Sequence, residues 1–337
     1  MIKDYLSEQV RRHPSSQPQD LIKHCYQAAF GSEHLLADFS AAFARFTAEF
    51  EAVLPQKMPL FEPLSEEICR INLAAWKQEG LPPAWLFRIF AATAAKKGDL
   101  EKNLREAGEL GLFPAAEWEK CLQEYRAAGM PAVHHSAAYR AAEKPAYCLA
   151  DRRFLRLLPI LRAAARSTKN PCIIAIDGRA ASGKSTVGQQ LRQILEGSLL
   201  HMDDFFLPPA LRTVERLKEN GGNVHYERFA EEVLPFLAGD VPFSYRIFDC
   251  SKMDFNGERR VEPKQFRIVE GSYSHHPAFG NYADITVFSS LEPEEQQERI
   301  LRRDGEELLR RFQECWIPWE EQYFAACRIA ESASIII

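Results

Sequence analysis

The chain has 337 residues, of which 46% are hydrophobic and 26% charged, and a formal net charge of −5. This length exceeds the usual single core and predicts two domains, and the ordinary composition indicates a folded globular protein. Without a basic excess, nucleic acid is disfavoured as a partner, and no apolar run approaches membrane-spanning length. The N-terminus lacks the apolar core of a signal peptide, so we expect a cytoplasmic location. Whether copies of the chain form a homo-oligomer stays open.

Eight cysteines are scattered along the chain without a CxxC pair. This spacing argues against a structural zinc site. It predicts reduced thiols that are mostly buried.

The first 150 residues are rich in Ala, Leu and Glu and poor in Gly. One set of phenylalanines recurs at a spacing that lines a single helix face: Phe39, Phe43, Phe46 and Phe50. This periodicity predicts an all-α domain over residues 1–150. The composition changes between Tyr147 and Arg153, and we assign residues 151–337 to a second domain.

Three segments of the N-terminal domain mix polar and aromatic residues: 24–34, 62–72 and 134–139. A pocket for a metal or an anionic ligand would combine His24, Glu33, His34, Arg70, His134 and His135. Their spacing matches no known metal-binding pattern. We therefore favour a helix cap at Ser32 and histidines bonded to the backbone.

The stretch from Cys172 to Thr186 reads CIIAIDGRAASGKST. An apolar run typical of a strand leads into a Gly-rich turn, and helical spacing of apolar residues follows, which is the context of a phosphate-binding P-loop. Lys184 would contact the β- and γ-phosphates, and the Ser185 hydroxyl would hold Mg²⁺. The predicted nucleotide-binding residues are Gly178, Arg179, Ala180, Ala181, Ser182, Gly183, Lys184, Ser185 and Thr186.

A second apolar strand is predicted in the segment LLHMDDFF, and it ends at Asp203 and Asp204. Acids at the carboxyl end of a strand beside a P-loop face the crevice where ligands bind. One of them could accept the proton of an attacking hydroxyl or coordinate Mg²⁺. The alternative is a helix N-cap or a solvated turn, which is the stronger alternative for Asp204.

Two further strands are predicted, at residues 266–269 and 285–288. The first ends at Glu270, which we take as a metal-orienting carboxylate. The second leads into a charged helix whose basic residues lie on one face: Arg299, Arg302 and Arg303. They could neutralise a transferred phosphoryl group, or they could form salt bridges on an exposed helix.

The motifs IAIDGRAASGKST, HMDDFF, RIVEGSYS and the arginine segment together resemble the uridine kinase and phosphoribulokinase group of P-loop kinases. The resemblance covers about residues 154–337 and implies a three-layer α/β fold with a mostly parallel sheet, and ATP and Mg²⁺ as cofactors. It implies Asp203 as the catalytic acid, and Lys184, Arg299 and Arg302 at the phosphates. It implies Ser185 and Glu270 at the metal. Acceptor-side residues implied by the resemblance are Asp204, Asn223, Tyr226, Arg228, Tyr245, Arg246, Asp249 and Tyr273. The N-terminal half faintly resembles an uncharacterised bacterial helical domain, which implies no activity.

These motifs predict a kinase that transfers the γ-phosphoryl group of ATP to a hydroxyl of a small metabolite, such as a nucleoside or a sugar-like compound. Uridine itself is less well supported, because the family's aromatic and histidine contacts to the pyrimidine cannot all be placed. A GTPase is disfavoured, since no Asn-Lys-x-Asp segment follows the P-loop. The alternative is an ATPase or regulatory switch in which the nucleotide state controls the helical domain.

Overall fold

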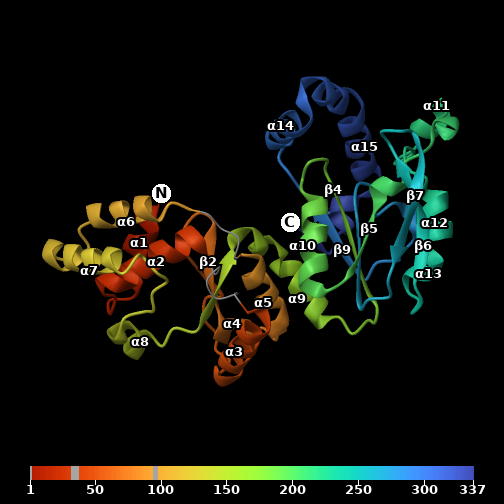
Figure 1. Cartoon of the computed structure of the whole chain (residues 1–337). Coiled ribbons are helices and arrows are strands. Elements are labelled where there is room, and N and C mark those ends of the chain that lie inside the picture. The colour runs from red at the N-terminus through yellow and green to blue at the C-terminus, as the bar shows by residue number, and fades with distance from the viewer. Residues whose placement is uncertain (1, 32–37, 94–97) are drawn as a thin grey trace. The chain divides into compact units, whose positions relative to one another are not determined.

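The structure is a computed structural model that describes residues 2–31, 38–93 and 98–337. The chain divides into two compact units, Met1–Arg156 and Leu157–Ile337 (Figure 1). The sequence places the division earlier, after Ala150. Strand β3 (Tyr147–Asp151) pairs inside the first unit, and the Arg152 N–H donates to the carbonyl of Glu67, so the chain leaves that unit later than its composition suggests.

The N-terminal unit is mainly helical, as predicted. Its core is a cluster of buried apolar residues that includes Leu6, Leu21, Leu104 and Leu122. The helices of this unit are α1 (Ile2–Arg12), α2 (Pro18–Phe30), α3 (Phe39–Ala52), α4 (Leu73–Gln78), α5 (Pro83–Ala92), α6 (Leu100–Glu109), α7 (Ala115–Ala127) and α8 (Ala137–Glu143).

The all-α description of this unit needs one correction, because the unit also contains a small antiparallel sheet. Strand β1 (Phe61–Pro63) pairs with β2 (Ile68–Asn72), and β2 pairs with β3. Four of the five residues of β2 are buried, so the strand shows no alternation of polar and apolar residues. Its partner β3 lies far along the chain, and neither strand shows a local signal that would mark the pair.

A five-stranded parallel sheet forms the centre of the C-terminal unit, in the order β10-β9-β4-β8-β5. This arrangement confirms the predicted fold class. The strands are β4 (Cys172–Gly178), β5 (Ser198–His201), β8 (Phe266–Glu270), β9 (Ile285–Ser289) and β10 (Ile335–Ile336). The hairpin of β6 (Phe243–Asp249) and β7 (Asp254–Val261) forms a separate two-stranded sheet.

Helices cover both faces of this sheet and give it three layers (Figure 1). Helix α10 lies against Leu199 and Glu270. Leu200 and Val269 point to the opposite face and join a core cluster with Phe229. The short helix η2 (Arg152–Leu157) ends the first unit. The helices of the C-terminal unit are α9 (Leu158–Arg166), α10 (Lys184–Leu195), η3 (Met202–Phe205), η4 (Pro209–Leu211), α11 (Val214–Leu217), α12 (Tyr226–Glu232), α13 (Leu234–Leu237), η5 (Pro277–Phe279), α14 (Pro293–Arg311), the π-helical η6 (Phe312–Trp316), α15 (Ile317–Cys327) and α16 (Ile329–Ser332).

Among the helices that the structure describes, none combines the length and apolar character needed to cross a membrane. The eight cysteines are free thiols. Four of them are buried, and Cys250 is exposed.

Candidate functional site

The P-loop joins the carboxyl end of β4 to the first residue of α10, as the sequence predicts. Gly178 has φ +139°, and a Cβ there would lie 2.1 Å from the carbonyl oxygen of Ser289, so only glycine fits. The Lys184 ammonium donates to the carbonyls of Gly178 at 2.6 Å and Arg179 at 2.9 Å. The loop thus holds a positive charge at the N-terminus of α10, where phosphate binds well.

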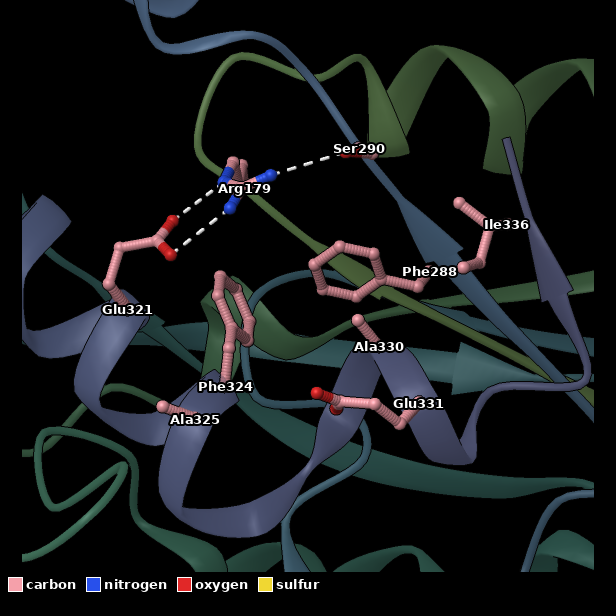
Figure 2. A pocket seen from close by; sticks show the side chains of 9 residues that line it. All are labelled: Arg179, Phe288, Ser290, Glu321, Phe324, Ala325, Ala330, Glu331 and Ile336. Carbon is pink, nitrogen blue, oxygen red and sulfur yellow. Dashed lines mark hydrogen bonds and ion pairs between the residues drawn. The ribbon is translucent and has the colours of Figure 1, made fainter.

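Helix α15 contacts the P-loop through a salt bridge (Figure 2). The Arg179 guanidinium forms a bidentate pair with Glu321, at 2.6 and 3.1 Å, and donates to the Ser290 hydroxyl at 3.2 Å. This pair borders a small cavity of about 290 Å³ whose walls include Phe288 and Phe324. The Arg179 side chain is therefore engaged in the structure of the loop, and its backbone N–H also donates within the protein, to the carbonyl of Ser289 at 3.2 Å.

Glu320 on α15 is a buried carboxylate that sequence reasoning missed. It accepts from the Ala180 N–H at 2.9 Å and from the Ser272 hydroxyl at 2.7 Å, so it ties the P-loop to the end of β8. Burial raises the pKa of Glu320, and the charge of Lys184 opposes that rise. In sequence this glutamate resembles any surface acid of a charged helix, and only its tertiary contacts distinguish it.

Glu270 lies between two polar side chains at the end of β8. It accepts from the Ser185 hydroxyl at 3.0 Å, and its other oxygen contacts Nδ1 of His201, a second residue that sequence reasoning missed. A carboxylate and a hydroxyl beside a phosphate-binding loop are the oxygen ligands that suit Mg²⁺. Over the described residues, no group of three or more His, Cys, Asp or Glu side chains could hold a metal. Phosphates and water would complete the shell of a Mg²⁺ ion here, as is usual for that ion.

A cavity of about 800 Å³, here called the main cavity, extends from the P-loop to Asp203. Lys184, Ser185 and Glu270 line it together with Asp203. The Asp203 side chain is exposed to solvent where it lines the cavity. Desolvation by the protein groups around its carboxylate, together with the charge of Glu270, raises the pKa of Asp203.

Asp204 has a different environment from Asp203. It is buried, and its carboxylate accepts from the Tyr245 hydroxyl at 3.0 Å and from Nε of Arg259 at 2.9 Å. Asp204 is outside the lining of the main cavity. The structure therefore separates the two adjacent aspartates.

Five further residues implied on the acceptor side also lie outside the lining of the main cavity: Tyr226, Arg228, Tyr245, Arg246 and Asp249. Arg228 is buried and donates to the carbonyls of Asp204 and Arg246. Arg246 pairs with Glu232 at 2.6 Å, and the Tyr226 hydroxyl contacts Arg216. These side chains make hydrogen bonds inside the unit, and their assignment as acceptor contacts stays a prediction. Tyr273 and Asn223 do line the cavity, as implied.

The arginines of α14 divide in a way that the sequence does not show. Arg299 lines the main cavity and donates to the carbonyl of Ala181 at 3.3 Å. Arg303 also lines it and pairs with Asp304 at 2.8 Å. Arg302 is exposed and is absent from the lining. Of the implied pair, Arg299 therefore lines the main cavity and Arg302 does not.

In the N-terminal unit, the structure brings His24, Arg70 and His135 into one buried polar cluster. Arg70 donates to Gln9 at 2.8 Å and to Gln27 at 3.2 Å. The cluster continues through other pairs: His24 with the carbonyl of Leu64, and His135 with Asp20 and Tyr147. His134 is exposed, whereas Ser32, Glu33 and His34 lie outside the described residues.

No family model matches the chain. It is 29% identical over 153 residues to the uridine kinase of Ligilactobacillus salivarius, a match that covers 42% of this chain and 71% of that protein. It is 21% identical over 136 residues to uridine-cytidine kinase C of Dictyostelium discoideum, which covers 40% of this chain but 30% of that protein. The chain contains a uridine-kinase-like P-loop kinase region. The predicted resemblance is thereby confirmed.

A solved structure described as a possible uridine kinase from Bacillus stearothermophilus aligns with a TM-score of 0.42 and 18% identity. That alignment covers 55% of this chain and 96% of the other.

Proposed function

We propose that the C-terminal unit is an ATP-dependent kinase that phosphorylates a hydroxyl group of a small metabolite. The observation that supports this most is that Asp203 faces the same cavity as Lys184 and Ser185. A base placed opposite a phosphate-binding loop is the arrangement that phosphoryl transfer requires. The names of both curated relatives are those of kinases, which agrees with this class of enzyme.

In this proposal the P-loop backbone and Lys184 hold the polyphosphate, while Ser185 and Glu270 hold Mg²⁺. The ion, when bound, would neutralise charge on the β- and γ-phosphates. Asp203 accepts the proton of the acceptor hydroxyl while the hydroxyl oxygen forms a bond to the γ-phosphorus. The bond between the γ-phosphorus and the β,γ-bridging oxygen breaks, which releases ADP. Arg299 adds positive charge from α14. Positioning and electrostatics supply most of the acceleration in such a reaction.

The alternative, an ATPase or switch, uses the same P-loop but needs no acceptor. The two functions are separated by measuring ADP formation from ATP and Mg²⁺ with and without a panel of hydroxyl compounds. We expect ADP formation that depends on an added compound and a phosphorylated product. Rapid ADP formation without any acceptor would favour the ATPase.

Lys184→Ala tests the role of the P-loop in the same assay. The Lys184 ammonium sits inside the loop, and removing such a charge should cost on the order of 3 kcal/mol in the transition state, a loss of at least about 100-fold in turnover. Lys218→Ala, at an exposed lysine outside the main cavity, is the matched control. Near-normal turnover in a folded Lys184→Ala variant would contradict the proposed nucleotide site.

A further inference from the structure

The wall of the main cavity beside Asp203 contains an arginine to which sequence reasoning gave no role. Arg212 follows η4 and lines the cavity. Its Nε donates to the carbonyl of Leu207 at 2.8 Å, which anchors the guanidinium by one edge. In the part of the chain that the structure describes, Arg212 makes no ion pair with a carboxylate within 4.0 Å, and the remainder of its guanidinium is left for a ligand.

The neighbouring carboxylates are already in use. Asp204 pairs with Arg259 at 2.9 Å. Asp249 accepts from the Ser251 hydroxyl at 2.6 Å and lies 3.6 Å from the ammonium of Lys252. Asp203, the proposed base, is needed for the acceptor hydroxyl. The charge of Arg212 therefore faces the cavity without a protein counter-ion among the described residues.

Arg212 and Asp203 line the same cavity. The exposed Cys250 also lines the cavity, and partial desolvation by the protein around it raises the pKa of its thiol. The charge of Asp203 adds to that rise, whereas the charge of Arg212 opposes it, so both groups act on the same thiol. Asn223 lines the same part of the cavity and adds an amide that can donate or accept.

Hydrogen bonds within the protein connect the wall that holds Arg212 and Asn223. The Leu207 N–H donates to the carbonyl of Asn223 at 3.0 Å, so the two parts of the wall are joined by the backbone. Arg216 donates to the carbonyl of Gly222 at 3.0 Å, and a Cβ at that glycine would lie 1.8 Å from the Arg216 carbonyl oxygen. A preorganised wall loses little freedom when a ligand binds.

We propose that the phosphoryl acceptor carries an anionic group, a carboxylate or a phosphate, which Arg212 binds while the acceptor hydroxyl faces Asp203. The planar guanidinium matches both anions and binds them with two parallel hydrogen bonds. A neutral nucleoside would leave this charge unmatched. The inference rests on the proposed kinase function and narrows its substrate class.

The test compares acceptors in matched pairs that differ in the anion: D-glycerate with glycerol, and ribose 5-phosphate with ribose. Uridine serves as the neutral nucleoside. We expect kcat/KM for the anionic member of at least one pair to exceed that of its neutral partner by about 10-fold or more. In Arg212→Gln this preference should fall by about 10- to 100-fold, mainly through KM of the acceptor, with KM of ATP unchanged. Arg212→Lys should restore part of the lost preference for the anionic acceptor. Lys218→Gln, at an exposed lysine, is the control and should keep the wild-type kcat/KM values.

A binding measurement checks the same point without turnover. Calorimetric titration of D-glycerate and ribose 5-phosphate into the full chain saturated with a non-hydrolysable ATP analogue and Mg²⁺ should show binding to the wild type and a loss in Arg212→Gln. Phosphoryl transfer to uridine, glycerol or ribose at a rate that Arg212→Gln does not change would overturn the inference. That outcome would still support the kinase function. A rise in the KM of ATP alone would assign Arg212 to the nucleotide and also overturn it. Acceptor-independent ADP formation, with no anion bound, would overturn both.

Discussion

Arg70 in the N-terminal unit and Arg212 in the C-terminal unit show two ways in which a fold uses a guanidinium. Arg70 is 3% exposed, donates to Gln9 and Gln27, and lies 4.6 Å over the ring of Tyr147. Arg212 is anchored by one nitrogen and presents the rest of its charge to a cavity of about 800 Å³. The first arginine is held by the protein, and the second is available to a ligand.

The same contrast holds for the groups around them. Both ring nitrogens of His135 form hydrogen bonds inside the protein, with Asp20 and Tyr147. Asp203 and Lys184 instead line a cavity that a ligand can enter. For an isolated arginine or histidine, residue type alone is therefore poor evidence for a binding site. The useful evidence is which polar atoms remain after the protein's own hydrogen bonds are made.

The adjacent aspartates give the largest expected difference within this contrast. Asp203→Asn keeps the shape of the side chain but removes its basicity, so turnover should fall by roughly 100- to 10,000-fold with ATP affinity little changed. Asp204→Asn should lower turnover less than Asp203→Asn does. It should instead lower the free energy of unfolding by on the order of 1–3 kcal/mol, because the buried Asp204 carboxylate accepts hydrogen bonds from Tyr245 and Arg259. Steady-state kinetics and denaturant unfolding of both variants measure these effects.

The pH profile of the wild type adds a second readout. Desolvation and the charge of Glu270 raise the pKa of Asp203 above the ordinary value of an aspartate. A protonated Asp203 cannot accept the hydroxyl proton, so turnover should be lost as the pH falls through this raised pKa. Equal kinetic losses in Asp203→Asn and Asp204→Asn would remove the distinction between the two aspartates.

Much of the phosphate site follows from local sequence. The P-loop, the four predicted strands and the acids at two strand ends occur where short patterns place them, because parallel strands bring their carboxyl ends to one edge of the sheet. Glu320, His201 and Arg212 gave no such signal. Each is defined by contacts with residues that are distant in sequence or by a cavity that several loops enclose.

The acceptor side was harder to predict for a physical reason. Arginine and tyrosine suit a ligand pocket and an internal polar network equally well. Arg228 and Tyr245 belong to such a network in this fold, as do the polar residues around Arg70. Short, mostly buried strands such as β2 likewise give no signal in a search for alternation of polar and apolar residues.

The histidine pair of the N-terminal unit tests whether its polar cluster is structural. Burial lowers the pKa of His135 to about 4 and that of His24 to about 3. In the unfolded chain both histidines would bind a proton near pH 6.5. Below that pH the unfolded state therefore binds more protons than the folded state. The free energy of unfolding should fall as the pH falls from about 6.5 to about 4. For His135 the loss amounts to up to about 3 kcal/mol.

Hydrogen exchange of the full chain, read on peptides from residues 17–30 and 135–151, measures this local stability. His135→Gln should reduce the pH dependence between pH 6.5 and 4 by about half, because His24 still titrates. His134→Gln changes an exposed neighbour and should leave the dependence as in the wild type. A pH dependence that survives unchanged in His135→Gln would mean that this histidine is not part of the buried cluster's titration.

The arginines of α14 give the smallest expected effect and locate the edge of the main cavity. Arg299 lines the cavity and touches the P-loop carbonyl of Ala181, so Arg299→Gln should lower kcat by about 10-fold through the loss of one charge-assisted contact. Arg302 is exposed and absent from the lining, so Arg302→Gln should change kcat by less than about 2-fold, a loss typical of an exposed charge. Parallel kinetics at low and high salt measure both variants, and only the small effect at Arg302 should disappear at high salt. If Arg302→Gln lost as much activity as Arg299→Gln, α14 would have to move during the reaction so that its exposed face reaches the phosphates.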